Sequence, residues 1–224
     1  MSDEPTSWIE EFNAKVESVA RFLNITTGSE IQAGAVEVLD ETLVTLKEKK
    51  ATSIQAKDED LANAVLGCEC VAEALRCELQ MWISLKKDDP HAAWDFLVAA
   101  QSASMDAARS HSGLQHWSKR HERLSLIQDL IYPGQIFMSP GGEVIGARCS
   151  ICDAEYGDCD HIRGRPYMGE FCRRIIYRMK LTEVSVVDEP ANRLCRVVEM
   201  DCDGTRRDTL TWRVARTTGS MLAQ

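Results

Sequence analysis

The chain has 224 residues, of which 44% are hydrophobic and 27% are charged, with a formal net charge of −9 at pH 7. A chain of this length can bury one large core or two small ones without disulfides. No run approaches the 18 apolar residues of a membrane span, so we expect no membrane partner. The first residues are acidic and lack the apolar segment of a signal peptide. We therefore expect the nine cysteines to be reduced and the protein to be cytoplasmic.

The charge is unevenly distributed along the chain. Residues 1–132 hold 13 Lys and Arg against 22 Asp and Glu, whereas residues 133–224 hold 13 of each. In the second part, 12 of the 13 basic residues are arginine, which suits bidentate contacts with carboxylate or phosphate groups. The first part should repel nucleic acid, and the second part can tolerate it.

The first part of the chain has the apolar periodicity of helices. Residues 58–87 show it best, because apolar positions there follow 4-3-4-3-4-3 steps over three heptads, as in bundle or coiled-coil packing. The positions are Leu61, Val65, Cys68, Ala72, Leu75, Leu79 and Trp82. The other helices are expected at residues 6–23, 30–49, 91–111 and 114–131. We predict an antiparallel α-helical bundle over residues 1–132, which forms homo-oligomers through the heptad helix or through the alanine-rich helix at 91–111.

From Tyr132-Pro133-Gly134 the pattern changes to short strands separated by Gly and Pro. Strands are expected at 135–138, 143–147, 171–179, 181–187, 193–200 and 209–214. Turns are expected at Ser139-Pro140-Gly141-Gly142 and Asp201-Cys202-Asp203-Gly204. The predicted fold class is α+β, in which the helical bundle precedes a small zinc-containing β-rich domain at 133–216 and a flexible tail at 217–224.

Residues 149–161, CSICDAEYGDCDH, bring together three cysteines and a histidine in the order C-x2-C-x6-C-x-H. Thiolate and imidazole ligands favour Zn2+ in a tetrahedral site. We predict one structural zinc ion per chain, because four local donors leave no position open for a catalytic water. The predicted ligands are Cys149, Cys152, Cys159 and His161.

Two alternatives to this ligand set follow from the same stretch. Cys172 lies eleven residues after His161 and can replace either member of the second pair. The cysteines can also be buried free thiols, which pack like small hydrophobic residues. Four acidic residues within the stretch argue against that interpretation, because carboxylates do not belong in an apolar core.

Five arginines follow the cysteine-rich stretch and are candidate contacts for nucleic acid or for a protein partner: Arg163, Arg165, Arg173, Arg174 and Arg178. The alternative is that they form surface ion pairs with the 13 acidic residues of the same part of the chain.

Residues 181–192, LTEVSVVDEPAN, resemble the phage prohead (capsid-maturation) protease family, which shows an E-V-S-L-V motif followed by P-A-N. The match covers twelve residues, about five per cent of the chain. It implies a β-barrel-like module over about residues 133–214 and a phage, prophage or phage-defence setting. The motif glutamate, which that family places in its catalytic triad, corresponds to Glu183. The family's serine and histidine strands have no counterpart between Gln135 and Met179.

These observations favour a non-catalytic zinc-binding interaction or scaffold protein that binds protein partners and carries a degenerate prohead-protease-like module. One alternative is a nucleic-acid-binding zinc protein. The other is an active prohead-type serine protease, for which the sequence lacks a histidine base beside a serine.

Overall fold

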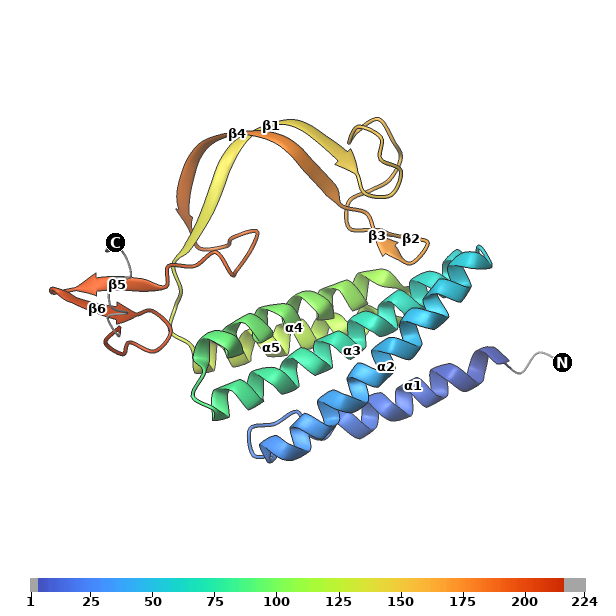
Figure 1. The fold of residues 1–224 in the computed structure, drawn as a ribbon, viewed down its shortest axis with the longest axis horizontal. Coiled ribbons are helices and arrows are strands. Elements are labelled where there is room, and N and C mark those ends of the chain that lie inside the picture. Colours follow the sequence, from blue (N-terminus) through green and yellow to red (C-terminus); the bar gives the residue numbers. More distant parts are fainter. Residues whose placement is uncertain (1–3, 216–224) are drawn as a thin grey trace, which may run out of the picture.

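The structure is a computed structural model that describes residues 4–215, and the predicted flexible tail at 217–224 lies outside the described residues. It combines helices with small antiparallel sheets, as the α+β prediction expects (Figure 1). The helices are α1 Glu4–Ala20, α2 Ser29–Gln55, α3 Glu59–Lys86, α4 Pro90–Ser110, the 3-10 helix η1 Ser112–Trp117 and α5 Ser118–Ile131. Within the described residues, none of these helices is both long enough and apolar enough to cross a membrane.

Aspartate side chains cap the N-termini of two central helices. The Asp58 carboxylate accepts a hydrogen bond from the backbone N–H of Leu61 at the start of α3, and Asp89 accepts one from Ala92 at the start of α4. Helix α2 ends at Gln55 rather than near residue 49, because residues 51–55 contain neither Gly nor Pro to stop it. The helix expected at 114–131 is also divided, since its first residues belong to η1.

Helix α3 lies at the centre of the helical part. Every predicted heptad position is buried except Leu61, which is partly buried and packs against the same core. The neighbouring helices of the same chain supply the rest of this core, from Phe12 of α1 and Leu39 of α2 to Ala107 of α4. Because the chain buries its own heptad positions, they are not exposed for contact with a second chain.

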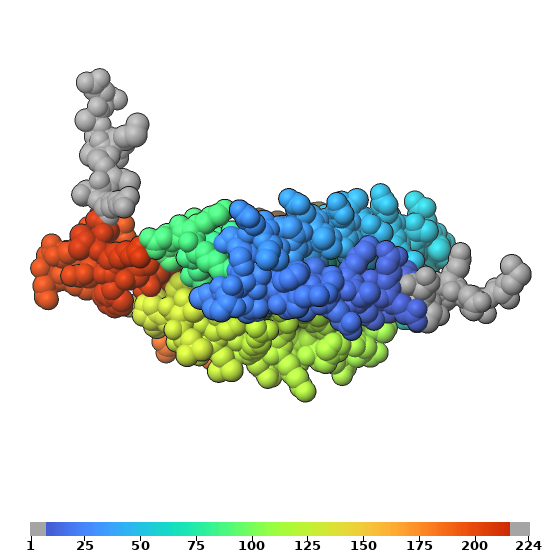
Figure 2. Space-filling model, turned by 90° about the horizontal axis from the view of Figure 1, so that it is seen from below, coloured from blue at the N-terminus to red at the C-terminus, as the bar shows by residue number. Residues whose placement is uncertain are grey.

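Cys68 and the alanine-rich face of α4, a candidate for contact with a second chain, are buried within the same chain. Burial raises the pKa of the Cys68 thiol to about 12, so that the thiol stays protonated at neutral pH. The alanines that line the α4 face, Ala93, Ala100, Ala103 and Ala107, are all buried. Figure 2 shows the molecule from below the view of Figure 1, where α1, α2 and α5 form most of the outer surface and the C-terminal part of the chain lies at one end.

Within residues 133–215, the strands form three separate two-stranded antiparallel sheets. The pairs are β1 Phe137–Cys149 with β4 Arg174–Val187, β2 Pro166–Tyr167 with β3 Glu170–Phe171, and β5 Glu199–Cys202 with β6 Thr205–Asp208. This arrangement differs from the barrel-like module that the family resemblance implies. The expected hairpin is present, with Asp203 and Gly204 between β5 and β6. The expected turn at residues 139–142 is absent, because these residues lie inside the continuous strand β1.

The paired strands β1 and β4 form a long ribbon that arches over the helices (Figure 1). One end begins at Phe137, which packs beside Trp94 near the start of α4. At the other end, the loop before β3 reaches α3, where the N–H of Gly169 donates to Oδ1 of Asn63 (2.9 Å). Arg109 near the end of α4 also contacts the Phe171 ring. From Trp94 to Arg109, α4 rises about 22 Å, whereas 13 strand residues span about 43 Å. The ribbon must therefore bow outward between its two attachments.

A second core cluster joins the two parts of the chain. Trp94 is fully buried, and its ring lies 5.2 Å from that of Tyr132 and 6.3 Å from that of Phe137, measured between centroids. Leu210, after β6, belongs to the same cluster. The expected domain boundary at Pro133 thus runs through shared packing, and the division into two domains there stays a prediction.

Candidate metal centre

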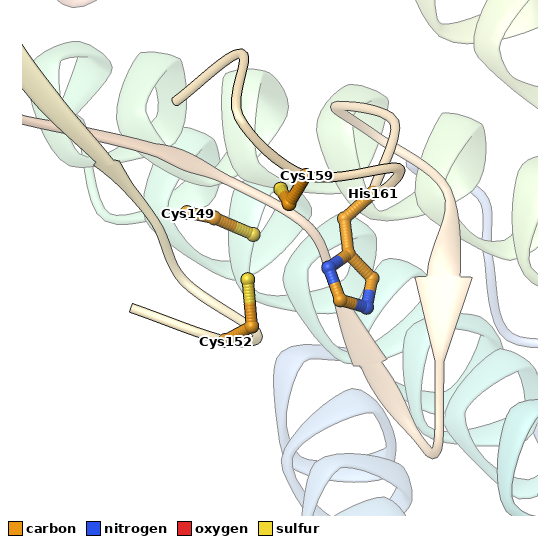
Figure 3. A group of neighbouring side chains, drawn as sticks. All are labelled: Cys149, Cys152, Cys159 and His161. Atoms are coloured by element: carbon orange, nitrogen blue, oxygen red, sulfur yellow. The ribbon is translucent and has the colours of Figure 1, made fainter. Parts of the chain in front are cut away.

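The four predicted ligands lie together at the far end of the β1–β4 ribbon. One potential ligand atom from each of Cys149, Cys152, Cys159 and His161 can be chosen so that all four lie within 4.8 Å of one another. Cys149 is the last residue of β1, and the other three belong to the loop that follows it. Figure 3 shows the three sulfur atoms and one ring nitrogen of His161 turned towards a common centre. The cluster can therefore hold a metal ion.

A tight turn places the first two sulfur atoms. The N–H of Asp153 donates to the carbonyl of Cys149 (2.9 Å), and Asp153 adopts a left-handed φ of 58°. Within the turn, the N–H of Ile151 points at Sγ of Cys149 (3.4 Å). The second reversal comes at Gly157, whose φ of 115° favours glycine.

The turn also favours the thiolate form of Cys149. Desolvation of this buried thiol raises its pKa, but hydrogen bonds from the backbone N–H groups of Cys152 and Ile151 outweigh that effect and bring the pKa to about 6. A thiolate is the form in which cysteine binds a metal. The local backbone thus prepares at least one anionic ligand.

The environment of His161 fits a metal ligand. Its Nδ1 is buried and has no hydrogen-bond partner among the described residues, a costly arrangement for a polar atom unless a ligand satisfies it. Tyr167 holds the ring in place by an edge-to-face contact at 4.6 Å between centroids. The Tyr167 hydroxyl in turn accepts a hydrogen bond from the N–H of Ile162 (2.8 Å).

Cys172 is a fifth sulfur atom beside the cluster. It is buried, and its Sγ lies 3.8 Å from Sγ of Cys149. Its backbone pairs with the metal-site loop, because its N–H donates to the carbonyl of Arg165 (2.9 Å) and its carbonyl accepts from Gly164 (2.8 Å). Desolvation and the neighbouring Cys149 sulfur raise the pKa of Cys172 to about 11. The structure thus keeps both candidates for the fourth ligand close to the site.

The acidic residues of the loop lie on its surface, away from an apolar core. Asp153, Glu155, Asp158 and Asp160 are all exposed. Arg148 pairs with Asp153 (3.3 Å), and the Tyr177 hydroxyl donates to Glu155 (2.7 Å). This distribution agrees with a polar metal loop rather than with a cluster of core thiols.

The structure brings three of the five candidate arginines together. Arg163, Arg173 and Arg174 line an open cavity of about 600 Å³, next to the metal site. Arg165 and Arg178 are exposed but do not line it. The cavity contains a fourth arginine, Arg109 at the end of α4, which the sequence did not indicate because it lies in the helical part.

Glu183, the residue that the family resemblance places in a triad, is exposed on β4 and pairs in register with Gly141. Among the described residues, no histidine lies on either strand of the ribbon. His91 does form a pair with a carboxylate, that of Asp208, at 2.6 Å. Its other ring nitrogen is occupied by the Arg196 guanidinium (2.7 Å), so it is not placed to accept a proton from a serine.

Comparison of the chain with protein-family models, with curated proteins and with solved structures gave no match.

Proposed function

We propose that the metal ion is zinc and that its role is structural. Three thiolates and one imidazole form a donor set that suits Zn2+. A Zn–S bond of about 2.3 Å corresponds to an S–S edge of about 3.8 Å in a tetrahedron, and the four donor atoms lie within 4.8 Å of one another before any ion draws them in. Four donors fill the coordination shell, so the ion would fix the loop at the far end of the ribbon.

We further propose that the protein is a non-catalytic interaction or scaffold protein that docks partners through the β1–β4 ribbon. The single observation that carries this proposal is the exposure of β4, which has exposed residues on both faces over most of its length. An isolated two-stranded ribbon is only marginally stable in water, so contact with a partner would stabilise it.

The two faces of the ribbon differ in chemistry. Register shifts interrupt the alternation of β4, and the resulting pairing puts Met179, Leu181, Val184 and Val186 on one face, where all four are exposed. Arg178 and Lys180 alternate with them and point to the opposite face. An exposed row of apolar side chains beside a free strand edge is typical of a surface that binds another chain.

The occupant that best fits this surface is a second copy of the chain. The ribbon carries four basic residues and two acidic ones, whereas residues 1–132 carry a net charge of −9. The basic ribbon of one copy and the acidic helices of another are therefore complementary in charge, which favours association. We therefore propose that the expected homo-oligomer contact lies on the ribbon, because the heptad positions of α3 are buried within one chain.

The exposed position of Glu183, with no histidine on the ribbon, supports the non-catalytic proposal over the serine protease. A fluorophosphonate probe tests the alternative. Labelling of the wild-type protein that is lost on replacing one serine would support the protease and overturn the non-catalytic proposal.

The interaction proposal is tested by measuring the mass of the protein in solution. Replacing Met179 and Leu181 together by serine should shift the wild-type oligomer towards monomer, because it removes two apolar side chains from one face. The matched control replaces Ile175 and Tyr177 together by serine, because these residues are exposed on the same strand but lie on its other face. A wild-type protein that is monomeric at micromolar concentration would contradict self-association. Equal effects of the two double variants would contradict the choice of face.

A further inference from the structure

The cavity beside the metal site has an unusual charge. Four arginines line it, Arg109, Arg163, Arg173 and Arg174, and the only acidic residue among its lining is Asp106. Asp106 pairs with Arg109 on the same helix. Among the described residues, no carboxylate lies within ion-pair distance of Arg163, Arg173 or Arg174. The cavity therefore has a surplus of about three positive charges that the chain itself does not neutralise.

Two of the four guanidinium groups are held in place by aromatic rings. The guanidinium of Arg109 lies 4.9 Å from the centroid of the Phe171 ring, and that of Arg174 lies 5.5 Å from the centroid of the Tyr156 ring. Cation–π contacts of this kind restrict the side chain while leaving its N–H donors free. Binding an anion then costs less conformational entropy than it would with mobile side chains.

The four arginines come from three separate parts of the chain. Arg109 ends α4, Arg163 follows His161 in the metal loop, and Arg173 and Arg174 lead into β4. The backbone keeps the last two beside the metal turn, since the carbonyl of Arg173 accepts from the N–H of Ser150 (3.0 Å). The cavity thus exists only when the metal loop is folded against α4.

We propose that this cavity binds a chain of two or three linked phosphates, such as that of a nucleoside di- or triphosphate. Guanidinium groups match the oxygens of phosphate in bidentate geometry. A surplus of several positive charges calls for a ligand with several negative charges, which a single carboxylate does not provide. A volume of about 600 Å³ suits a ligand of that size.

A compact ligand fits this surface better than a nucleic-acid strand does. An extended strand would continue from the cavity over helices whose part of the chain carries a net charge of −9, and would be repelled there. The cavity also lacks a free aromatic surface on which bases could stack, because Phe171 is buried beneath Arg109.

The test is calorimetric titration of the full-length, metal-loaded protein with inorganic tripolyphosphate. We expect saturable binding of one ligand per chain, and weaker binding of orthophosphate. The Arg163→Gln/Arg173→Gln variant should bind at least about tenfold more weakly, because each lost guanidinium removes charge-assisted hydrogen bonds. The matched control is Arg165→Gln/Arg178→Gln, which removes the same charge outside the cavity and should bind as the wild type does.

A third variant tests whether the charge inside the cavity determines the affinity for the ligand. Asp106→Asn removes the one carboxylate of the lining and should tighten binding several-fold. The zinc content of the protein is measured before and after the titration and must stay constant. A calorimetric signal that follows the loss of zinc would mean that the ligand chelates the metal, and it would overturn the proposal.

Two further ligands distinguish the sources of the phosphates. Binding of ATP as tight as that of tripolyphosphate assigns recognition to the phosphate chain alone, and tighter binding of ATP assigns it to a nucleotide. Binding of single-stranded DNA without binding of tripolyphosphate would overturn the proposal in favour of a nucleic-acid surface. An equal loss of affinity in the two arginine double variants would also overturn it, because the effect would then not depend on the cavity.

Discussion

Cys172 and Cys149 lie 23 positions apart in the chain, yet their sulfur atoms are only 3.8 Å apart. That separation matches the edge of a zinc–sulfur tetrahedron, about 3.8 Å. Cys172 is therefore placed to act as a reserve ligand, next to a site that already has four donors.

The first prediction follows from this reserve. His161→Ala should keep one bound metal ion with reduced affinity, because Cys172 takes the fourth position. With cobalt as a probe, the absorption of the variant should change from that of three sulfurs and one nitrogen to that of four sulfurs. The double variant His161→Ala/Cys172→Ser should lose the metal.

Cys172→Ser alone serves as the control for this prediction and should bind metal as the wild type does. Loss of metal in that single variant would mean that Cys172 is a primary ligand and that His161 is not. Retention of metal in the double variant would mean that neither residue is required.

The second prediction concerns removal of the metal. Chelation should leave the far-ultraviolet helical signal nearly unchanged, because the core formed by α1 to α4 contains none of the ligands. Protease cleavage within residues 150–172 should increase at the same time, since the loop loses its cross-link. Collapse of the helical signal on chelation would contradict the separation of the helical core from the metal site.

The third prediction concerns the junction of the two parts. Trp94→Ala should lower the free energy of unfolding by about 3–5 kcal/mol, because it opens a cavity in the cluster that Tyr132 and Phe137 share. Trp212→Ala is the control, because that side chain is 47% exposed and should contribute little. Denaturant titration of the two variants measures the difference. Similar values for both would show that the shared cluster is not important for stability.

The fourth prediction concerns pH. Desolvation raises the pKa of Asp208, but hydrogen bonds from Thr211 and the nearby His91 outweigh it and leave the pKa below its ordinary value of 3.8. A carboxyl with a lowered pKa contributes stability above pH 3.8 and loses it as the pH falls through the folded-state value. Asp208→Asn should therefore be less stable than the wild type at pH 7, with a smaller loss of stability on acidification below about pH 4.

The control for the pH prediction is Asp203→Asn, an exposed residue at the tip of the β5–β6 hairpin. Thermal melts of wild type and both variants between neutral and acidic pH give the comparison. A parallel decline of stability in the wild type and in Asp208→Asn would show that this carboxyl does not contribute to the pH dependence.

The helices and the ligand cluster could be predicted because their signals are local. The 3.6-residue period identifies which positions of α3 are buried, and short spacing brings Cys149 and Cys152 into one turn. The cavity arginines could be predicted only in part. Arg109 reaches the cavity through the packing of α4 against the metal loop, and no local pattern indicates such a contact.

The long strand β1 could not be predicted, because Pro140, Gly141 and Gly142 ordinarily indicate a turn. In the structure, the ladder shifts register between Gly141 and Gly142, and a Cβ on Gly142 would lie 2.5 Å from the carbonyl oxygen of Lys180. Glycine is therefore needed there for a close approach of two strands rather than for a reversal. Pro140 is tolerated because a two-stranded ribbon has a free edge, where a missing N–H leaves no partner unsatisfied.

The outward bow of the ribbon determines how far its tip can reach. While both ends are attached, the metal loop stays beside Asn63 and Arg109, within about 22 Å of Trp94 along α4. If the loop detaches, the ribbon keeps its attachment at Phe137 and its full length of about 43 Å. The contacts of Gly169 with Asn63 and of Phe171 with Arg109 therefore hold the loop at about half the distance from Trp94 that the ribbon could span if these contacts were released.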